Sequence, residues 1–328
     1  MSNTFVLLSG TCHPEFMRVA DYLETDWRLV FVEEQPDNPA LGLELGQADA
    51  VLSMAWSRTM PPTPRLKLLQ LPGAGTDLVD LAAAPPTAAV CNVYEHEIGI
   101  AEYLVCTMLM WVTGIKAMEQ RFRKDDWSDS LYAGGPVHGE LMGSTVGIVG
   151  YGRIGRALAE RLRPFGTRII ARTRSPENGD DNLDEIGPMA DLTTLLAQSD
   201  FVVLSLPLNA ETEGLFDAAV LRQMKPTGVL INVARGGLVD QDDLYQACRE
   251  GWIGGAVIDT WYDYPEKGST IRRPSRQPFH ELDNVIMTPH SSGWSAGILP
   301  RRCRAIAQNL DRLALGRPLR NVVRPPWA

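Results

Sequence analysis

The segment Val146-Gly-Ile-Val-Gly-Tyr-Gly-Arg-Ile-Gly155 reads as a buried strand that runs through a glycine turn into a helix. The first glycine of Gly-x-Gly-x-x-Gly permits a tight turn, the second lets the backbone approach a phosphate group, and the third allows close helix packing. Amides at the helix start complement negative charge. A turn without ligand is the alternative. The segment predicts a pyrophosphate site formed by Gly150, Gly152, Arg153, Ile154 and Gly155.

Further apolar runs on both sides of this segment predict two sheets. Strand-like runs at 145–149, 168–171, 201–204, 228–232, 255–258 and 284–287 alternate with helical segments, an order typical of a doubly wound parallel sheet. Residues 1–96 show the same alternation, with runs at 5–8, 29–32, 50–52 and 66–71. Between the two series, apolar positions recur at helical spacing from Glu97 to about Arg123 and predict one long bridging helix.

We therefore expect an α/β protein with two doubly wound parallel-sheet lobes. A Rossmann-type coenzyme lobe, residues 99–291, is inserted into a smaller flavodoxin-like substrate-binding lobe, residues 1–98 and 292–328. The helical segment 301–315 and the proline-rich tail are expected to return to the first lobe. Ligands of such sheets bind beyond the carboxyl ends of the strands, so we expect them in the cleft between the lobes.

Composition excludes several classes of partner. Lys and Arg number 31 against 40 Asp and Glu, giving a net charge of −9, which disfavours nucleic acids and anionic membranes. The longest apolar stretch, 103–115, is too short to cross a bilayer, and the first residues lack the basic start of a signal peptide. The five cysteines are scattered without metal-ligand spacing, so neither a disulfide framework nor a metal site is expected. A cytoplasmic protein with small-molecule partners fits best.

The residues after the second strand of the coenzyme lobe bear on coenzyme choice. Dinucleotide sites commonly carry an acidic residue there, which accepts from the ribose hydroxyls. This chain has Arg172-Thr173-Arg174-Ser175 instead. Arginine forms bidentate bonds to phosphate oxygens, so these residues predict recognition of a 2′-phosphate and a preference for NADP(H), with NAD(H) as the weaker alternative. Two solvated surface arginines are the other interpretation.

Four further motifs complete a known pattern. They are Pro72-Gly-Ala-Gly-Thr-Asp77, Leu206-Pro-Leu-Asn-Ala-Glu-Thr212, Asn232-Val-Ala-Arg-Gly-Gly237 and Thr288-Pro-His290. With the glycine turn, and in this order, the chain from about residue 66 to 293 resembles the D-isomer-specific 2-hydroxyacid dehydrogenases. The resemblance is strongest to their glyoxylate/hydroxypyruvate reductase type.

The resemblance implies roles that the reduction of a 2-keto acid also requires. Such a reaction needs a cation for the carboxylate and carbonyl, and a proton donor for the new alkoxide. Arg235 resembles the family's substrate-clamping arginine, and His290 its general acid/base. The backbone of Gly73, Ala74 and Gly75 resembles the loop that holds the substrate carboxylate.

Other positions receive roles from the same resemblance. Asp259 matches the residue that contacts the nicotinamide carboxamide, and Pro207, Thr212 and Ala234 match further coenzyme contacts. Trp56 is expected to line the substrate pocket, although aromatic residues more often belong to the core.

One departure concerns the histidine. The family normally has a glutamate one residue before the proline in this segment, whereas the chain reads Asp259-Thr-Trp-Tyr-Asp-Tyr264-Pro265. We expect Tyr264 to orient His290 by a hydrogen bond without stabilising its charge. Asp263, Glu266, Glu95 and Glu97 remain alternative carboxylate partners.

The loop that follows Pro265 is long and carries three arginines. They are Arg272, Arg273 and Arg276. This loop is interpreted either as steering an acidic substrate or as an ordinary solvated loop.

The sequence thus predicts an NADPH-preferring reductase of a small 2-keto acid. Its expected quaternary state is the homodimer common in the family, with Met108, Trp111 and Met118 as interface candidates. A dinucleotide-sensing binding protein without catalysis is the alternative, favoured by the missing glutamate. Retention of both Arg235 and His290 weighs against it.

Overall fold

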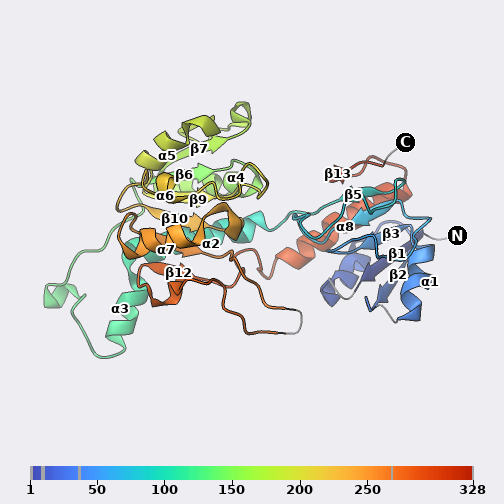
Figure 1. Ribbon diagram of the computed structural model, residues 1–328, viewed down its shortest axis with the longest axis horizontal. Helices are drawn as coiled ribbons and strands as arrows, with labels where there is room; N and C mark the ends of the chain where they lie inside the picture. The colour runs from blue at the N-terminus through green and yellow to red at the C-terminus, as the bar shows by residue number, and fades with distance from the viewer. Residues whose placement is uncertain (1–2, 9–11, 36–37, 267–268, 327–328) are drawn as a thin grey trace. The chain divides into compact units, whose positions relative to one another are not determined.

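The computed structural model describes residues 3–8, 12–35, 38–266 and 269–326. The chain forms two compact units, one of Met1–Glu95 with Ala296–Ala328 and one of His96–Ser295. The first and last parts of the chain, blue and red in Figure 1, therefore belong to the same unit. The predicted α/β fold with two parallel-strand sheets is confirmed.

The first unit contains a six-stranded sheet in the order β13-β5-β4-β3-β1-β2. All neighbours are parallel except β13, which pairs antiparallel with β5. Its strands are β1 (Asn3–Leu8), β2 (Trp27–Val32), β3 (Ala50–Leu52), β4 (Leu68–Gln70), β5 (Ala89–Cys91) and β13 (Val322–Arg324). Its helices are η1 (Pro14–Tyr22), α1 (Pro39–Gln47) and α8 (Ile298–Ala314), of which α8 packs against η1. The C-terminal tail thus closes one edge of this sheet through β13.

The second unit contains a seven-stranded parallel sheet in the order β12-β11-β10-β9-β6-β7-β8. Its strands are β6 (Thr145–Val149), β7 (Arg168–Thr173), β8 (Glu185–Pro188), β9 (Phe201–Leu204), β10 (Val229–Asn232), β11 (Gly255–Ile258) and β12 (Val285–Met287). The strand order reverses direction between β6 and β9, which is where doubly wound sheets bind ligands at their carboxyl edge.

Helices cover both faces of the second sheet, and each face has its own apolar core. The helices are α2 (Glu97–Thr113), α3 (Ile115–Phe122), α4 (Arg153–Leu162), α5 (Leu192–Gln198), α6 (Ala218–Leu221) and α7 (Gln241–Arg249). Short 3-10 turns are η2 (Leu131–Ala133), η3 (Arg163–Phe165), η4 (Pro176–Asn178), η5 (Met189–Asp191), η6 (Gly236–Leu238) and η7 (Phe279–Glu281).

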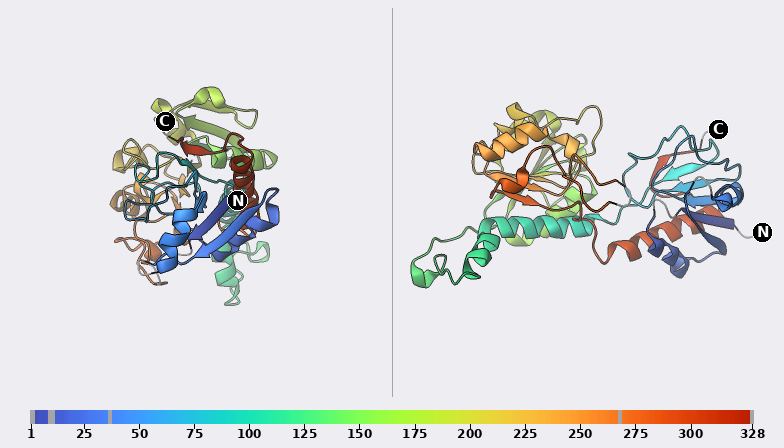
Figure 2. Two further views of the ribbon diagram at one scale, coloured as in Figure 1. Left: turned by 90° about the vertical axis from the view of Figure 1, so that its right-hand side faces the viewer. Right: turned by 60° about the horizontal axis from the view of Figure 1, so that its bottom comes forward.

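The predicted single bridging helix is wrong, because the structure breaks it into α2 and α3 at Gly114. Gly114 adopts the left-handed conformation with φ 62°, and its amide donates to the carbonyls of Met110 and Trp111, which ends α2. The two helices meet at 59°. In Figure 2, α2 runs along the sheet of its unit, whereas α3 leads away from it.

No single helix in the described part of the chain is long and apolar enough to span a membrane. Together, α2 and α3 would reach that length and composition, but they form a bent pair. Residues Ile100, Leu104 and Met108 of α2 are buried in the core of the second unit.

Candidate functional site

The glycine turn has the geometry of a phosphate-binding loop. Gly150 has φ 97°, and a side chain there would approach the amide of Leu206 to 2.9 Å. A Cβ on Gly155 would lie 2.8 Å from the Gly150 carbonyl, so close packing of α4 on β6 requires glycine. A Cβ on Gly152 would meet no described atom within 4 Å. The residues present therefore fit a bound pyrophosphate, with open space over Gly152.

The first turn of α4 offers the matching donors. The first α4 amide that donates to a backbone carbonyl is that of Arg156, which bonds to Gly152. The amides of Arg153, Ile154 and Gly155 precede it at the positively polarised end of the helix. The turn is also fixed to its neighbours: the Gly150 amide donates to the Arg172 carbonyl at 2.8 Å, and Ser205 Oγ donates to the Gly150 carbonyl at 2.6 Å.

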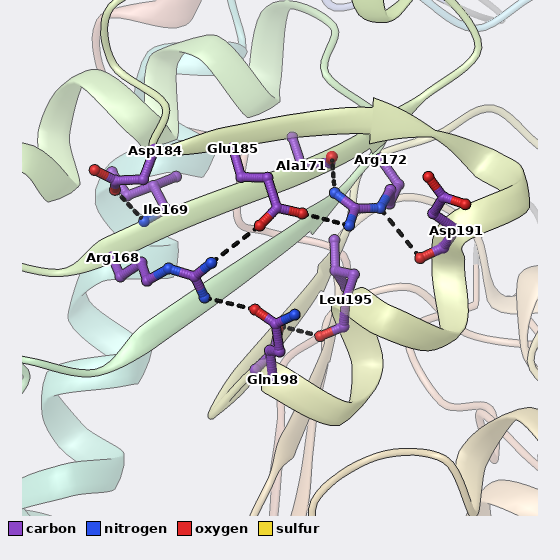
Figure 3. Close-up of polar contacts among 10 residues, drawn as sticks. Arg168, Ile169, Ala171, Arg172, Asp184, Glu185, Asp191, Leu195 and Gln198 are labelled. Carbon is purple, nitrogen blue, oxygen red and sulfur yellow. Dashed lines mark hydrogen bonds and ion pairs between the residues drawn. The ribbon is translucent and has the colours of Figure 1, made fainter.

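Arg172 does not occupy the predicted position, and this part of the prediction is corrected. Only 2% of the residue is exposed, and its guanidinium lies between β7, β8 and the start of α5 (Figure 3). It donates to Glu185 Oε1 at 2.6 Å, to the Asp191 carbonyl at 3.1 Å and to the Ala171 carbonyl at 2.8 Å. Glu185 also bonds to Arg168 at 3.0 Å. Arg172 therefore stabilises the edge of the sheet and is not available to a coenzyme phosphate.

The end of β7 nevertheless remains free of acidic residues. Thr173 and Ser175 are half-buried, and Arg174 is exposed. The Ser175 amide bonds to Thr173 Oγ1 at 3.4 Å, which closes a small turn. Within the described segment 172–175, Arg174 is thus the arginine that stays exposed beside the hydroxyls.

The other coenzyme positions from the resemblance lie at the ends of β9, β10 and β11. Thr212 Oγ1 donates to the Pro207 carbonyl at 2.7 Å, which holds this exposed loop in a turn. Ala234 is 7% exposed and lies two residues beyond the end of β10. Asp259 is completely buried, and this contradicts its predicted contact with a carboxamide because no surface of it is accessible to a ligand.

Asp259 instead organises the loop that carries His290. Its Oδ1 accepts from Thr288 Oγ1 at 2.6 Å and from the Ser291 amide at 2.9 Å, and its Oδ2 accepts from the Ser292 amide at 3.0 Å. Because Thr288 donates its one hydroxyl proton to Asp259, Tyr103 must be the donor in its 2.7 Å bond with Thr288. A buried carboxylate thus fixes the loop on both sides of the histidine.

Tyr264 lies against the imidazole, as expected for an orienting group. Its Oη is 2.9 Å from His290 Nδ1, and the Trp261 amide donates to the same oxygen at 3.1 Å. Trp261 Nε1 also donates to the Thr288 carbonyl at 2.7 Å. Loss of surrounding water raises the pKa of Tyr264, so the phenol is neutral at physiological pH. The ring of His290 is therefore positioned by a group that carries no charge.

The environment of His290 favours the neutral imidazole. Partial burial lowers the pKa of His290 below its ordinary value; the negative charge of Asp259 opposes this shift, and the positive charge of Arg235 adds to it. Of the alternative carboxylates, Asp263 instead bonds to Arg272 at 3.2 Å, and Glu97 lies 3.9 Å from Arg153.

Arg235 is held at the end of β10 by a turn that needs glycine. Asn232 Nδ2 donates to the Arg235 carbonyl at 2.9 Å, and Asn232 Oδ1 accepts from the Ala234 amide at 3.1 Å. A side chain on Gly236 would clash with the Trp261 carbonyl, so the turn packs directly on the segment that leads to Tyr264. The half-buried Arg235 therefore has a fixed backbone.

A pocket of about 590 Å³ lies beside the histidine within the second unit. Its walls include Trp261, Tyr264, Met287, Pro289 and His290, with Asp263 and Arg272 at its polar part. The long loop supplies Thr270, Arg272 and Pro274 to this pocket, while its residues 267–268 lie outside the described part.

Two of the three loop arginines are paired. Arg272 bonds to Asp263, and Arg276 bonds to Asp242 through Nε at 2.9 Å. These ion pairs reduce the charge that the loop offers to an acidic substrate.

In the first unit, the carbonyls of the loop Gly73–Gly75 are anchored by hydrogen bonds. The Gly73 carbonyl accepts from the Val93 amide at 3.1 Å, and the Ala74 carbonyl accepts from Asn92 Nδ2 at 2.8 Å. Peptide planarity directs the amides of Ala74 and Gly75 away from these anchored carbonyls. The residues are therefore suited to donate to a carboxylate.

Trp56 is a core residue, which corrects the prediction that it lines the substrate pocket. It is 2% exposed, packs in the apolar cluster over one face of the first sheet and donates from Nε1 to the Ala83 carbonyl at 3.4 Å. Three residues that the sequence did not predict as functional, Trp261, Thr288 and Tyr103, support the histidine loop. Trp261 and Thr288 lie inside the motif segments 259–265 and 288–290, and this position is the one sequence signal for their role. Tyr103 lies in no such motif.

Known proteins are similar to this chain over most of its length. The family model described as D-isomer specific 2-hydroxyacid dehydrogenase, NAD binding domain, matches residues 105–292. A glycerate dehydrogenase of Methylorubrum extorquens is 33% identical over 270 residues, covering 81% of each chain. A glyoxylate reductase of Thermococcus onnurineus is 33% identical over 273 residues, covering 80% of this chain and 78% of its own.

A solved structure is similar over nearly the whole chain. It is a D-isomer specific 2-hydroxyacid dehydrogenase of Xanthobacter autotrophicus in complex with NADPH and MES. It is 26% identical, covers 99% of each chain and has a TM-score of 0.78.

Proposed function

Because the chain belongs to the D-isomer-specific 2-hydroxyacid dehydrogenase family, we propose that it reduces a small 2-keto acid, of the glyoxylate or hydroxypyruvate kind, to the D-2-hydroxy acid. The chain is an oxidoreductase that uses a nicotinamide dinucleotide. The observation that supports this proposal most directly is the oriented imidazole of His290, with Tyr264 Oη at 2.9 Å and the charge of Arg235 near enough to lower its pKa.

The roles of the residues follow from the charge that develops during reduction. A reduced nicotinamide, when held by the glycine turn, would supply the hydride for the keto carbon. Arg235 attracts the substrate carboxylate and keto oxygen. His290 donates a proton to the keto oxygen through Nε2, because its Nδ1 already bonds to Tyr264.

In this proposal, each of the two units binds a different ligand group. The second unit holds the coenzyme through Gly150, Gly152 and the first turn of α4, and the Gly73–Gly75 loop of the first unit is proposed to bind a carboxylate through its amides. These assignments rest on the glycine geometry and on the anchored carbonyls of the loop.

NADPH is proposed as the preferred coenzyme, now on the basis of Arg174 without Arg172. An acidic residue at the end of β7 would repel a 2′-phosphate, and the chain has Thr173, Arg174 and Ser175 there. The bound NADPH named for the Xanthobacter autotrophicus protein agrees with this choice. The preference for NADPH over NADH is weaker than two arginines would give, because the Arg172 guanidinium is bonded to Glu185 inside the protein.

The test is a coenzyme oxidation assay on the purified protein. Glyoxylate, hydroxypyruvate and longer 2-keto acids are each mixed with NADPH or NADH, and the absorbance of the reduced nicotinamide is followed. We expect turnover with NADPH, and loss of turnover without loss of NADPH binding in His290→Ala. Coenzyme binding without reduction of any 2-keto acid would instead support the non-catalytic sensing protein.

A homodimer is proposed as the quaternary state. The segment after α3 exposes apolar side chains to an unusual degree: Leu131 is 89%, Tyr132 94% and Val137 98% exposed. Such side chains are commonly covered by a partner. Met108, by contrast, is fully buried in the core of the second unit, so it is removed from the predicted interface. Light scattering should give twice the chain mass, and Leu131→Asp should shift it toward the single chain.

A further inference from the structure

A second pocket, lined by several arginines, lies in the first unit at the C-terminal end of α8. It has a volume of about 270 Å³ and is lined by Tyr22, Glu24, Arg304, Gln308, Asp311, Arg312, Arg317 and Arg320. Four guanidinium groups therefore surround a small cavity in a protein whose net charge is −9. None of the residues assigned to substrate or coenzyme lines this pocket.

The chain forms the pocket by folding back after α8. Gly316 adopts the left-handed conformation with φ 64° and reverses the chain direction. The Arg320 amide then bonds to Asn309 Oδ1 at 2.9 Å, and Arg320 Nη1 donates to Gln308 Oε1 at 2.9 Å. Arg312 Nε donates to the Pro318 carbonyl. These bonds bring residues from the helix and from the following segment around one cavity.

The arginines are not needed to satisfy the end of the helix. Cations near a helix C-terminus often bond to its last carbonyls. Here backbone amides already do so: Leu315 donates to Asp311, Arg317 to Arg312 and Gly316 to Leu313. The helix end therefore does not engage the guanidinium groups, and Arg312 and Arg320 each use one N–H group in the bonds that shape the pocket and keep the others for another partner.

The acidic groups of the pocket do not neutralise the arginines. The Asp311 carboxylate is 6% exposed and accepts from the Glu24 amide at 3.1 Å, the Thr25 amide at 3.0 Å and Thr25 Oγ1 at 2.6 Å. Within the ranges that the structure describes, Arg304, Arg312, Arg317 and Arg320 form no ion pair with a carboxylate.

One of the four is braced by an aromatic ring. The guanidinium of Arg304 lies 5.3 Å from the centre of the Tyr22 ring, a contact that restrains the cation. Counting Glu24 and Asp311 against the four arginines leaves two positive charges around the cavity. The pocket thus has the charge to hold a small dianion.

We propose that this pocket binds a small phosphate-bearing anion, either inorganic phosphate or pyrophosphate, or a phosphomonoester of similar size. Guanidinium forks match phosphate oxygens with paired charge-assisted hydrogen bonds. The cavity is smaller than the roughly 300 Å³ at which pockets for larger ligands begin. It therefore suits a phosphate group better than a complete dinucleotide.

The test is isothermal titration of the full-length protein with pyrophosphate, phosphate and glycerol 3-phosphate. NADPH is kept saturating, so that the glycine turn of the second unit is occupied. We expect one site per chain for at least one probe, with affinity that falls as ionic strength rises. The relative affinities distinguish inorganic ions from a phosphomonoester. Absence of binding by all three probes would overturn the proposal.

Variants locate the binding. Arg317→Ala/Arg320→Ala removes two exposed cations outside the catalytic machinery and should weaken binding by about tenfold or more, with kcat unchanged. The variant Arg317→Lys/Arg320→Lys keeps both positive charges but loses the paired N–H groups of the guanidinium. Its affinity for the anion should therefore lie between that of the double alanine variant and that of the unmodified protein. Arg123→Ala, which removes an exposed cation from the other unit, is the matched control and should bind the anion as the unmodified protein does. Equal affinity in the alanine and unmodified proteins would place the anion elsewhere and refute the assignment.

Discussion

Replacement of Tyr264 by glutamate tests how the protonation of His290 is controlled. In the unmodified protein the imidazole bonds to a neutral phenol and its pKa is lowered. Reduction needs the protonated ring, so kcat/KM for a 2-keto acid should be highest at low pH. It should decline as the pH rises through the lowered pKa, which lies below the ordinary value of about 6.5.

The size of the expected change follows from the geometry. A glutamate is about 2 Å shorter than a tyrosine, which would place its carboxylate about 5 Å from Nδ1 rather than 2.9 Å. Tyr264 is 47% exposed, so an effective dielectric constant of about 40, between surface and water values, is appropriate. The attraction to imidazolium is then about 1.7 kcal/mol, which raises the pKa of His290 by about one unit.

The assay is the pH profile of kcat/KM for glyoxylate with Tyr264→Glu, and with Tyr264→Gln as the uncharged control of equal length. The midpoint should move upward by about one pH unit in the glutamate variant only. Tyr264→Phe should keep the midpoint and lower kcat by about three- to tenfold, since one orienting hydrogen bond is lost. A wild-type profile that stays flat to about pH 9, or equal midpoints in the glutamate and glutamine variants, would refute this account.

Arg174→Ala should reduce the ratio of kcat/KM for NADPH over NADH by about tenfold, whereas Arg172→Ala should leave that ratio nearly unchanged. Arg172→Ala should instead lower the free energy of unfolding by about 2 kcal/mol, measured by denaturant titration, because it removes a buried guanidinium and leaves Glu185 with only its second partner. A large change in coenzyme preference without loss of stability would contradict the internal role. Gly236→Ala should lower kcat/KM about a hundredfold by displacing the catalytic turn, while Gly237→Ala, which meets only the flexible Leu208 side chain at 3.1 Å, serves as its control.

Three strands of the second unit could be predicted with the bounds that the structure gives them, because nearly all of their residues are buried. Such strands are continuous apolar runs, and β6, β9 and β11 begin and end where their runs do. The strand β8, Glu-Ile-Gly-Pro, was missed because it lies at the edge of the sheet and contains a charge, a glycine and a proline. The antiparallel edge strand β13 lies in the proline-rich tail and was missed for the same reason.

The error about Arg172 follows from the missed strand. Its burial depends on Glu185, which β8 places beside β7, and nothing in the local sequence of β7 signals that partner. The glycine turn is different, because its requirements are set within a few consecutive residues. The role of Asp259 also depended on contacts distant in sequence, since its partners lie about thirty residues further along the chain.

His290 itself lies in the left-handed region, with φ 55°, a conformation that costs a non-glycine residue about 1–2 kcal/mol. The hydrogen bonds that the Ser291 and Ser292 amides donate to the Asp259 carboxylate hold it there. The protein is thus less stable at this position than its fold allows, in exchange for an imidazole that needs no reorganisation when substrate arrives. Directed evolution for heat resistance alone would therefore tend to discard this histidine in favour of glycine or asparagine, and any such library needs a simultaneous screen for turnover.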